Sequence, residues 1–267
     1  MSPHVAPSVQ KSSDAIKLAV ASAARGLVER EALLELIVLA AVAREHVLVI
    51  GPPGTAKSQA VRRIATALGG SYFEYLLGRF TEPTEIFGPI DLRKLREGSV
   101  VTETRGMLPE AEIAFLDEVF LGSTAILNSL LGILNERRFR RGHSAVDCPL
   151  RVCVGASNAL PDDDQLAAFA DRFLVRVFVD SMPDPRLEEL LEQGWGLAAV
   201  TSHGHASLSD LDTLAESAKH ADLSEIRPRL AHAVRLLRKA GIALSDRRVV
   251  KTQSLIAAAA ALAGRST

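Results

Sequence analysis

The sequence predicts an α/β protein in which helices cover both faces of a parallel sheet. Short, β-branched apolar runs alternate with longer stretches of helical periodicity. These runs are almost continuously hydrophobic, as in strands that are buried on both faces. The chain has 267 residues, of which 48% are hydrophobic, so it can bury a large core without disulfides. We therefore expect a five-stranded parallel sheet flanked by helices, with a smaller helical part after it.

The N-terminal region is expected to be a loose tail followed by two helices. Residues 1–12 are polar and contain prolines, a composition typical of a disordered tail. From Ser13 to Arg44 apolar residues recur at helical spacing, with an interruption near Gly26. These residues open the first structured domain.

Five apolar runs are the expected strands. They are His46–Ile50, Tyr72–Leu77, Ile113–Asp117, Arg151–Ala156 and Phe173–Val179. Two charged, turn-bearing segments interrupt their alternation with helices, Leu95–Leu108 and Glu136–Pro149, and both predict projecting hairpins.

A linker is expected after the last strand. Asp180–Pro185 contains two prolines and two aspartates, and the residues beyond it have helical patterns. We therefore expect a large α/β domain over residues 13–181 and a small helical domain over residues 182–267.

Composition argues against a membrane protein and against a generally basic surface. Lys and Arg number 31 and Asp and Glu number 32, so no overall field attracts the chain to nucleic acid or to an anionic membrane. The longest apolar run, Leu255–Ala263, is too short to cross a bilayer, and the N-terminus lacks the pattern of a secretory signal. Cys148 and Cys153 are too few for a zinc cage. We expect a soluble cytoplasmic protein with buried thiols and no membrane insertion.

The segment GPPGTAKS, residues 51–58, resembles a phosphate-binding loop and follows an expected strand directly. In such loops backbone N–H groups and a helix N-terminus face the phosphates, a lysine supplies positive charge, and a hydroxyl reaches Mg²⁺. Lys57 and Ser58 are at the required positions, but Ala56 stands where a second glycine is usual. Alanine is tolerated there if its φ is negative and is strained if its φ is positive, and the sequence leaves this open.

Polar residues follow two further strands. Asp117 and Glu118 end one run and Asn158 follows another, so in a parallel sheet all three reach the edge where ligands bind. Asp117 can help to hold Mg²⁺, Glu118 can activate an attacking water, and Asn158 can orient that water or the γ-phosphate. The alternative, that the two acidic residues only cap a helix, becomes weak beside a phosphate loop.

Two arginine positions could complete the site. Arg172 precedes the last strand, where it is badly placed for its own phosphate and well placed for that of a neighbouring subunit. Its alternative is an ion pair with Asp171. Arg247 and Arg248 begin the last long helix, and one of them could reach the γ-phosphate of its own subunit; solvated helix arginines are the alternative.

In this order the motifs resemble those of AAA+ ATPases, more closely the MoxR family, and within it the RavA-type proteins. The resemblance covers most of the chain and is densest in Phe73–Pro89, Gly106–Glu118 and Ile126–Gly142. It implies an AAA+ P-loop core with a helical lid, and it implies that alanine before the loop lysine is compatible with a working site.

The resemblance assigns roles to residues of this chain. Asp117 and Glu118 would be Walker B, Asn158 sensor 1, Arg172 the arginine finger acting in trans, and Arg247 sensor 2. Ser58 and Asp117 would hold Mg²⁺. The residues expected to bind ATP, apart from Asp117, are the Walker A segment Gly51, Pro52, Pro53, Gly54, Thr55, Ala56, Lys57, Ser58 and Gln59, with Leu27 and Val28 at the adenine. Glu29 departs from AAA+ proteins in general, which usually have glycine there.

The family forms hexameric rings that remodel other proteins, often with a partner that carries a von Willebrand factor A (vWA) domain. We therefore expect a homohexameric ATP hydrolase that uses Mg²⁺ and has such a partner. The chain ends where a lid would end, so another polypeptide is expected to select the substrate.

Two other functions are compatible with the sequence. The chain could be a nucleic-acid motor or loader, since Arg137–Gly142 places four arginines on one expected hairpin, although the near-neutral charge makes nucleic acid an unfavoured partner. It could also be a scaffold that changes shape with its bound nucleotide and hydrolyses it little. The presence of Glu118, which can activate water, argues against this function.

Overall fold

A five-stranded parallel sheet organises the molecule. The computed structural model describes residues 6–141, 144–196 and 206–265. The strand order is β2-β3-β6-β1-β7, and every pair of neighbours is parallel. These strands are β1 Val47–Ile50, β2 Tyr72–Leu76, β3 Ile113–Asp117, β6 Val152–Ser157 and β7 Val175–Phe178. All five predicted strands and the parallel sheet are confirmed.

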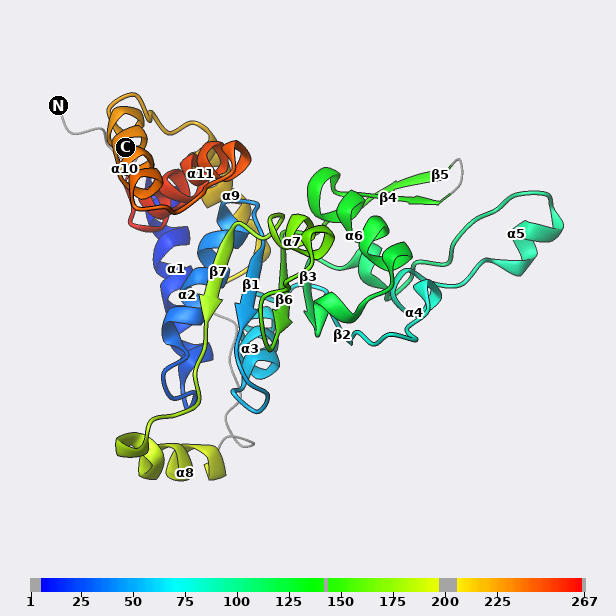
Figure 1. Cartoon of the computed structure of the whole chain (residues 1–267), viewed down its shortest axis with the longest axis horizontal. Coiled ribbons are helices and arrows are strands. Elements are labelled where there is room, and N and C mark those ends of the chain that lie inside the picture. Colours follow the sequence, from blue (N-terminus) through cyan, green and yellow to red (C-terminus); the bar gives the residue numbers. More distant parts are fainter. Residues whose placement is uncertain (1–5, 142–143, 197–205, 266–267) are drawn as a thin grey trace.

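Two hydrophobic clusters lie on opposite faces of this sheet. Alternate residues of β1 divide between them, because successive side chains of a strand point to opposite faces. Val47 and Val49 join one cluster, whereas Leu48 and Ile50 join the other. The first cluster packs against α1, α2 and α3, and the second against α6 and α7 (Figure 1). This two-sided burial explains why the strands have continuous apolar runs.

Helices make up most of the remaining chain. The α-helices are α1 Pro7–Ala24, α2 Glu31–Val42, α3 Lys57–Leu68, α4 Pro83–Phe87, α5 Leu92–Arg96, α6 Thr124–Glu136, α7 Asp164–Ala170, α8 Leu187–Gly196, α9 Leu208–Lys219, α10 Ile226–Lys239 and α11 Asp246–Leu262. Short 3₁₀ helices are η1 Leu108–Glu110, η2 Val119–Leu121 and η3 Asp184–Arg186.

The prediction of a loose tail through residue 12 is wrong from Pro7 onward, since α1 begins there. Proline is favourable in the first turn of a helix, where its missing N–H has no intrahelical partner. Val9 and Ser12 are buried, and the Ser12 hydroxyl donates a hydrogen bond to Asp210 of α9. The sequence did not reveal this start because the partner of Ser12 lies almost two hundred residues away in the chain.

The C-terminal helices pack on the N-terminal ones. Leu211 and Leu214 of α9 and Ala258 and Ala261 of α11 belong to the same buried cluster as α1 and α2. Helix α8 lies at the other end of the molecule, beyond the carboxyl end of β7 (Figure 1). The C-terminal part is helical as predicted, and a domain boundary at residue 181 stays a prediction.

Both interrupting segments project from the sheet (Figure 1). The first contains α5 and is closed at its base by an antiparallel bridge between Ile90 and Thr102. The second is an antiparallel pair formed by β4 Arg138–Arg141 and β5 Ser144–Asp147. The second hairpin is therefore confirmed, whereas the first projecting segment carries a short helix that the turn pattern did not reveal.

Both cysteines are free and buried, as expected. Burial raises the pKa of Cys148 to about 11 and that of Cys153 to about 12, because a thiolate is poorly solvated there. The alanine-rich run lies in α11, and none of the helices in the described ranges is long and apolar enough to cross a membrane. The cytoplasmic location stays a prediction.

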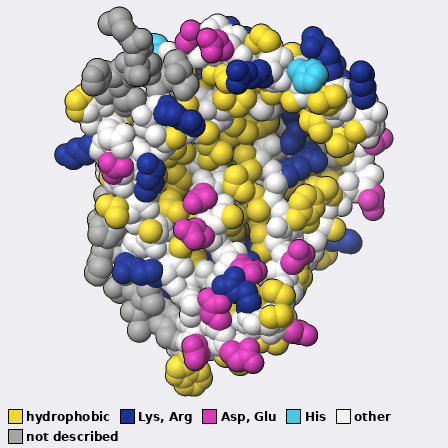
Figure 2. Space-filling model, turned by 90° about the vertical axis from the view of Figure 1, so that its left-hand side faces the viewer, with side chains coloured by type: hydrophobic (Ala, Val, Ile, Leu, Met, Phe, Trp, Pro, Cys, Tyr) yellow, Lys and Arg dark blue, Asp and Glu magenta, His cyan; other side chains and the backbone are white. Residues whose placement is uncertain are grey.

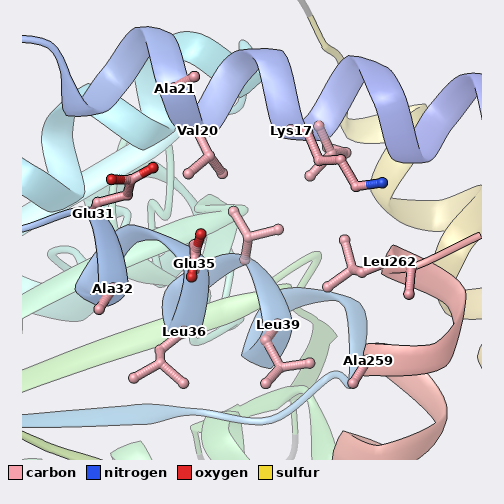
Figure 3. A pocket seen from close by; sticks show the side chains of 13 residues that line it. Lys17, Val20, Ala21, Glu31, Ala32, Glu35, Leu36, Leu39, Ala259 and Leu262 are labelled. Carbon is pink, nitrogen blue, oxygen red and sulfur yellow. The ribbon is translucent and has the colours of Figure 1, made fainter.

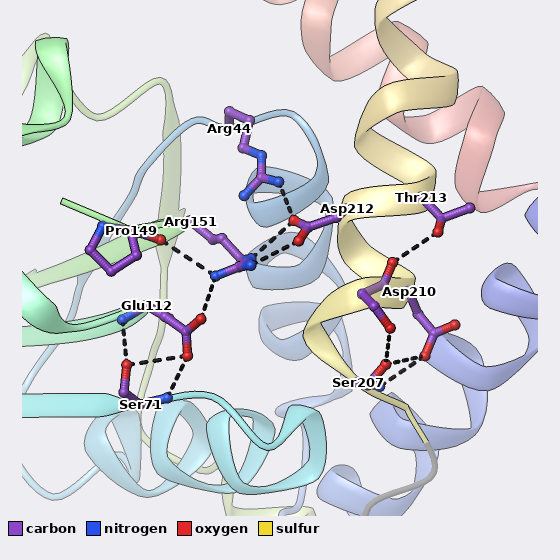
Figure 4. A network of polar contacts seen from close by, with 10 residues as sticks. Arg44, Ser71, Glu112, Pro149, Arg151, Ser207, Asp210, Asp212 and Thr213 are labelled. Atoms are coloured by element: carbon purple, nitrogen blue, oxygen red, sulfur yellow. Dashed lines mark hydrogen bonds and ion pairs between the residues drawn. The ribbon is translucent and has the colours of Figure 1, made fainter. Parts of the chain in front are cut away.

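Asp212 connects α9 to the edge of the sheet where the strands begin (Figure 4). Its two carboxylate oxygens accept hydrogen bonds from Arg151 at 3.0 and 2.8 Å, and one of them also pairs with Arg44. Arg151 in turn donates to Glu112 at 2.8 Å. The Arg151 side chain is only 14% exposed, so this bidentate pair is better shielded from solvent than an ordinary surface ion pair.

Replacing Asp212 with alanine should lower the free energy of unfolding by about 1–2 kcal/mol, because Arg151 and Arg44 lose a shared acceptor. Thermal denaturation should show a decrease in Tm of about 2–6 °C. Glu216→Ala is the matched control, since Glu216 lies on the same helix and pairs only with the nearby Lys219 and His220 among the described residues. Equal Tm values for the two variants would contradict this role.

The contribution of Asp212 to the stability of the fold should also depend on pH. Hydrogen bonds from Arg151 lower the pKa of this carboxyl group below its ordinary value. Its stabilisation is therefore complete above the unfolded-state pKa of about 3.9 and is lost as the pH falls through the lower folded-state pKa. The difference in stability between wild type and Asp212→Asn should shrink below about pH 4 in urea titrations. A constant difference from pH 7 to pH 3 would exclude this linkage.

Candidate functional site

The glycine-rich loop joins the carboxyl end of β1 to the first turn of α3. The Gly51 N–H donates to the carbonyl of Ser157 at 3.0 Å, which fixes the start of the loop against β6. A Cβ at Gly51 would lie 2.0 Å from the carbonyl oxygen of Val179, so no larger residue fits. Gly54 has φ = +78°, a conformation that glycine adopts without strain. Gly51 is therefore required by the close contact, and Gly54 is favoured by its backbone conformation.

Ala56 has the strained conformation that the sequence left open. It precedes α3 with φ = 59° and ψ = 26°, in the left-handed region. This conformation costs a non-glycine residue roughly 1 kcal/mol. The loop thus keeps its shape although alanine replaces the usual glycine.

Lys57 is the buried cation of the loop. Its Nζ donates to the carbonyls of Gly51 at 2.7 Å and of Pro52 at 2.9 Å. Burial lowers the pKa of Lys57, whereas the nearby Asp117 and Glu118 raise it. The side chain is held over the loop by main-chain acceptors that a phosphate can replace.

The structure brings Glu118 and Asn158 together, as predicted. The Asn158 side-chain amide donates to a Glu118 carboxylate oxygen at 2.7 Å. Glu118 has φ = 49°, and its N–H donates to Asp117 at 3.0 Å. These residues and the loop follow three adjacent strands, β3, β6 and β1, so they share one edge of the sheet.

The chemistry of Ser58 and Asp117 fits a hard cation. A hydroxyl and a carboxylate are oxygen donors of the kind that Mg²⁺ prefers when phosphates complete its coordination. Ser58 lies in the first turn of α3. Asp117 ends β3 and is close enough to Lys57 to raise the pKa of its amine.

A cavity of about 300 Å³ lies beside the loop. Leu27 and Val28, the predicted adenine contacts, line it together with residues 53–56 of the loop and with Leu187 and Leu190 of α8. Glu29 has φ = 55°, which is the conformation that favours the glycine usual in the family. Its carboxylate pairs with Arg186 at 2.8 Å, next to α8.

A larger cavity, of about 670 Å³, lies between α1, α2 and α11. Figure 2 shows apolar side chains gathered in a hollow on this side of the molecule, and in Figure 3 only Lys17, Glu31 and Glu35 add charge to its lining. None of the predicted nucleotide ligands lines this cavity, and its apolar walls do not suit a phosphate.

Arg172 lies at the opposite edge of the sheet from the loop. It precedes β7, which runs parallel to β1, whereas the loop follows β1. Its expected alternative partner, Asp171, instead pairs with Arg248 at 3.7 Å. Arg172 is therefore placed as predicted, away from the phosphate loop of its own chain.

The expected role of Arg247 at the γ-phosphate of its own subunit stays a prediction. Arg248, its neighbour, donates to the carbonyls of Phe173 at 3.2 Å and Leu174 at 2.8 Å, just before β7. Packing of α11 against α9 and α2 holds its first turn at this edge (Figure 1). The sequence showed which helix carries the arginines but not where that helix docks.

Three arginines at this edge have donors without a partner in the described parts of the chain. They are Arg172 and Arg176 through Nε and Arg247 through one terminal nitrogen, and all three atoms are buried. Burial lowers the pKa of Arg176, with a further contribution from Arg248. A buried guanidinium nitrogen without an acceptor is unfavourable, which makes this edge a candidate anion site.

Sequence reasoning missed Arg30, which is 7% exposed and donates to carbonyls on both sides of the loop. The only signal was an arginine directly before an apolar helix, a pattern also typical of surface residues.

Comparison with known proteins gives a consistent family. Residues 14–216 match the model of the MoxR domain in the MoxR-vWA-beta-propeller ternary systems. An uncharacterized protein of Methanocaldococcus jannaschii is 38% identical over 239 residues, covering 89% of this chain and 62% of that protein. Chaperone MoxR1 of Mycobacterium tuberculosis is 26% identical over 207 residues, covering 76% of this chain and 54% of that protein.

The fold has a solved counterpart. The crystal structure of a candidate ATPase from Cytophaga hutchinsonii superposes with a TM-score of 0.78 at 15% identity, covering 97% of this chain and 83% of that one. This likeness confirms the predicted fold class. The chain spans 62% and 63% of the length of two related Methanocaldococcus jannaschii proteins. The finer resemblance to RavA-type proteins stays a prediction.

Ala56→Gly should raise the free energy of unfolding by about 1 kcal/mol, because glycine adopts the left-handed conformation without strain. Ala60→Gly is the matched control: Ala60 lies within α3, where the same substitution should cost about 1 kcal/mol. Urea unfolding would measure both. Destabilisation by Ala56→Gly would contradict the left-handed geometry.

Proposed function

Because this chain belongs to the MoxR family of AAA+ ATPases, we propose that it binds ATP with Mg²⁺ and hydrolyses it within an oligomeric ring to remodel a partner protein. The observation that carries this proposal is the pairing of Asn158 with Glu118 beside the phosphate loop. A binding-only switch would not need a carboxylate positioned to act on water.

The residues of the chain divide the reaction among them. Backbone N–H groups of the loop and the N-terminus of α3 would bind the phosphates, and Lys57 would exchange its carbonyl acceptors for phosphate oxygens. Glu118 would take a proton from the attacking water while Asn158 holds the carboxylate in position. When bound, Mg²⁺ would neutralise phosphate charge, with Ser58 and Asp117 as its protein donors.

The arginines at the far edge support hydrolysis between subunits. A loop at one edge and unpaired guanidinium donors at the other can meet only when two copies stack head to tail, the arrangement that closes into a ring. We therefore assign Arg172 as the arginine finger that acts on the nucleotide of the neighbouring subunit. We propose that Arg247 acts at the same interface. A homohexamer is the ring that the family resemblance implies.

A partner with a vWA domain is part of the proposal, because the matched family model describes MoxR domains from MoxR-vWA-beta-propeller systems. The name chaperone borne by the Mycobacterium tuberculosis relative supports remodelling as the class of activity. A cytoplasmic location remains part of the same proposal.

The nucleic-acid alternative is less well supported. Arg138 of the β4–β5 hairpin pairs with Asp147 at 2.8 Å and Arg140 pairs with Glu136 at 2.7 Å. Arg137 is turned inward and donates to the carbonyls of Leu134 and Arg44. Arginines that already have acceptors in the chain offer little free charge to a phosphate backbone.

Purified protein should hydrolyse ATP only with Mg²⁺, and the specific activity should rise with protein concentration because the finger comes from another copy. Glu118→Gln should lower kcat by about a hundredfold or more while leaving nucleotide binding intact. Phosphate release and binding of a fluorescent nucleotide measure the two effects. Wild-type turnover no faster than that of Glu118→Gln would favour the switch over the ATPase.

Alanine substitutions at Arg247 and Arg248 should separate an effect on ATP turnover from an effect on thermal stability. Arg248→Ala should lower Tm, since Arg248 binds two carbonyls before β7 and pairs with Asp171. Arg247→Ala removes a side chain with an unpaired buried donor, so it should leave Tm within about 2 °C and lower ATP turnover about tenfold or more. Unchanged turnover in a fully assembled Arg247→Ala ring would remove Arg247 from the proposed site.

A further inference from the structure

We propose that Arg30 is a positioning residue that holds the Thr55–Ala56 peptide in its phosphate-binding orientation and couples it to the linker after β7. This inference rests on the proposed nucleotide site. Its basis is the position of one buried guanidinium between two parts of the chain that flank the loop.

Three donors of Arg30 bind main-chain carbonyls. Nε donates to Thr55 at 2.9 Å, one terminal nitrogen to Glu29 at 3.0 Å, and the other to Asp180 at 3.1 Å. The residue directly precedes α2 and is 7% exposed. A planar fork of this kind can bind several acceptors at once in a fixed geometry, which a lysine cannot do.

The bond to Thr55 controls the next amide. The peptide that joins Thr55 to Ala56 is planar and trans, so its carbonyl and its N–H point in opposite directions. With the Thr55 carbonyl held by Arg30, the Ala56 N–H must face away from Arg30. Ala56 is also the residue with φ = 59°, so the same bond opposes the tendency of alanine to leave the left-handed region.

The bond to Asp180 reaches the other side of the loop. Asp180 follows Val179, whose N–H donates to Ile50 at 2.8 Å and whose carbonyl lies against Gly51. Arg30 therefore connects the end of the loop at Thr55 with the linker that lies against its beginning. The linker leads into α8, which lines the 300 Å³ cavity, so a shift of the loop on nucleotide binding would be transmitted to α8.

The charge of Arg30 has no hydrogen-bonded carboxylate among the described residues, because its three bonds are to main-chain carbonyls. Burial lowers the pKa of Arg30, partly offset by Glu29 and Asp180. At Lys57, burial is the largest cause of a lowered pKa, and repulsion from the charge of Arg30 lowers that pKa further. Asp117 and Glu118 oppose this repulsion, since each raises the pKa of Lys57. A nucleotide polyphosphate would relieve that repulsion.

The test is a double-mutant cycle on binding of Mg²⁺ and N-methylanthraniloyl-ADP by the full chain. Arg30→Lys keeps the charge but loses the fork, so the Kd should rise about tenfold. The Kd of the Ala56→Gly single variant, measured alongside, supplies the fourth corner of the cycle. In the Arg30→Lys background, Ala56→Gly should lower the Kd about fivefold, because glycine keeps the left-handed conformation without the hydrogen bond from Arg30.

Arg62→Lys is the control, since Arg62 lies on α3 and pairs at the surface with Glu74. Thermal melts establish that each variant is folded at the temperature of measurement. Equal Kd values for wild type and Arg30→Lys, or effects that simply add, would overturn the inference while leaving the proposed function intact. Absence of nucleotide binding by wild type would overturn both.

Discussion

The parallel direction of the five strands is the constraint on which the site depends. It places the ends of β1, β3 and β6 at one edge, where the loop, Asp117, Glu118 and Asn158 meet. The same constraint places Arg172, which precedes β7, at the other edge. Because a four-residue strand spans roughly 13 Å, the two groups cannot meet within one chain without disrupting the sheet. The proposed division of the site between subunits thus follows from sheet topology.

Much of this arrangement could be predicted from the sequence. Continuous apolar runs located the strands, and polar residues at their ends located the acidic pair and Asn158, because these signals are local. The start of α1 at Pro7, the docking of α11 and the burial of Arg30 could not be predicted in this way. Each depends on packing between segments far apart in the chain, such as the contact between Ser12 and Asp210.

Ala56 shows how a local departure from a motif can be accommodated. The strain of its left-handed backbone is small beside the free energy of a folded domain, and a charge-assisted hydrogen bond to Thr55 is of comparable size. The loop therefore keeps the glycine conformation with alanine, provided that a buried donor holds the neighbouring peptide. Glu29, with φ = 55° and an ion pair to Arg186, is a second position where a specific contact accompanies a strained residue.

In the proposed ring, one chain supplies the acidic pair and its neighbour supplies the arginine. The most direct measurement is ATP turnover in mixtures of Glu118→Gln and Arg172→Ala chains, each inactive alone. Mixing should restore activity, because an Arg172→Ala subunit keeps its Glu118 and receives Arg172 from a Glu118→Gln neighbour. Turnover equal to the sum of the two separate variants, in rings shown to contain both chains, would contradict it.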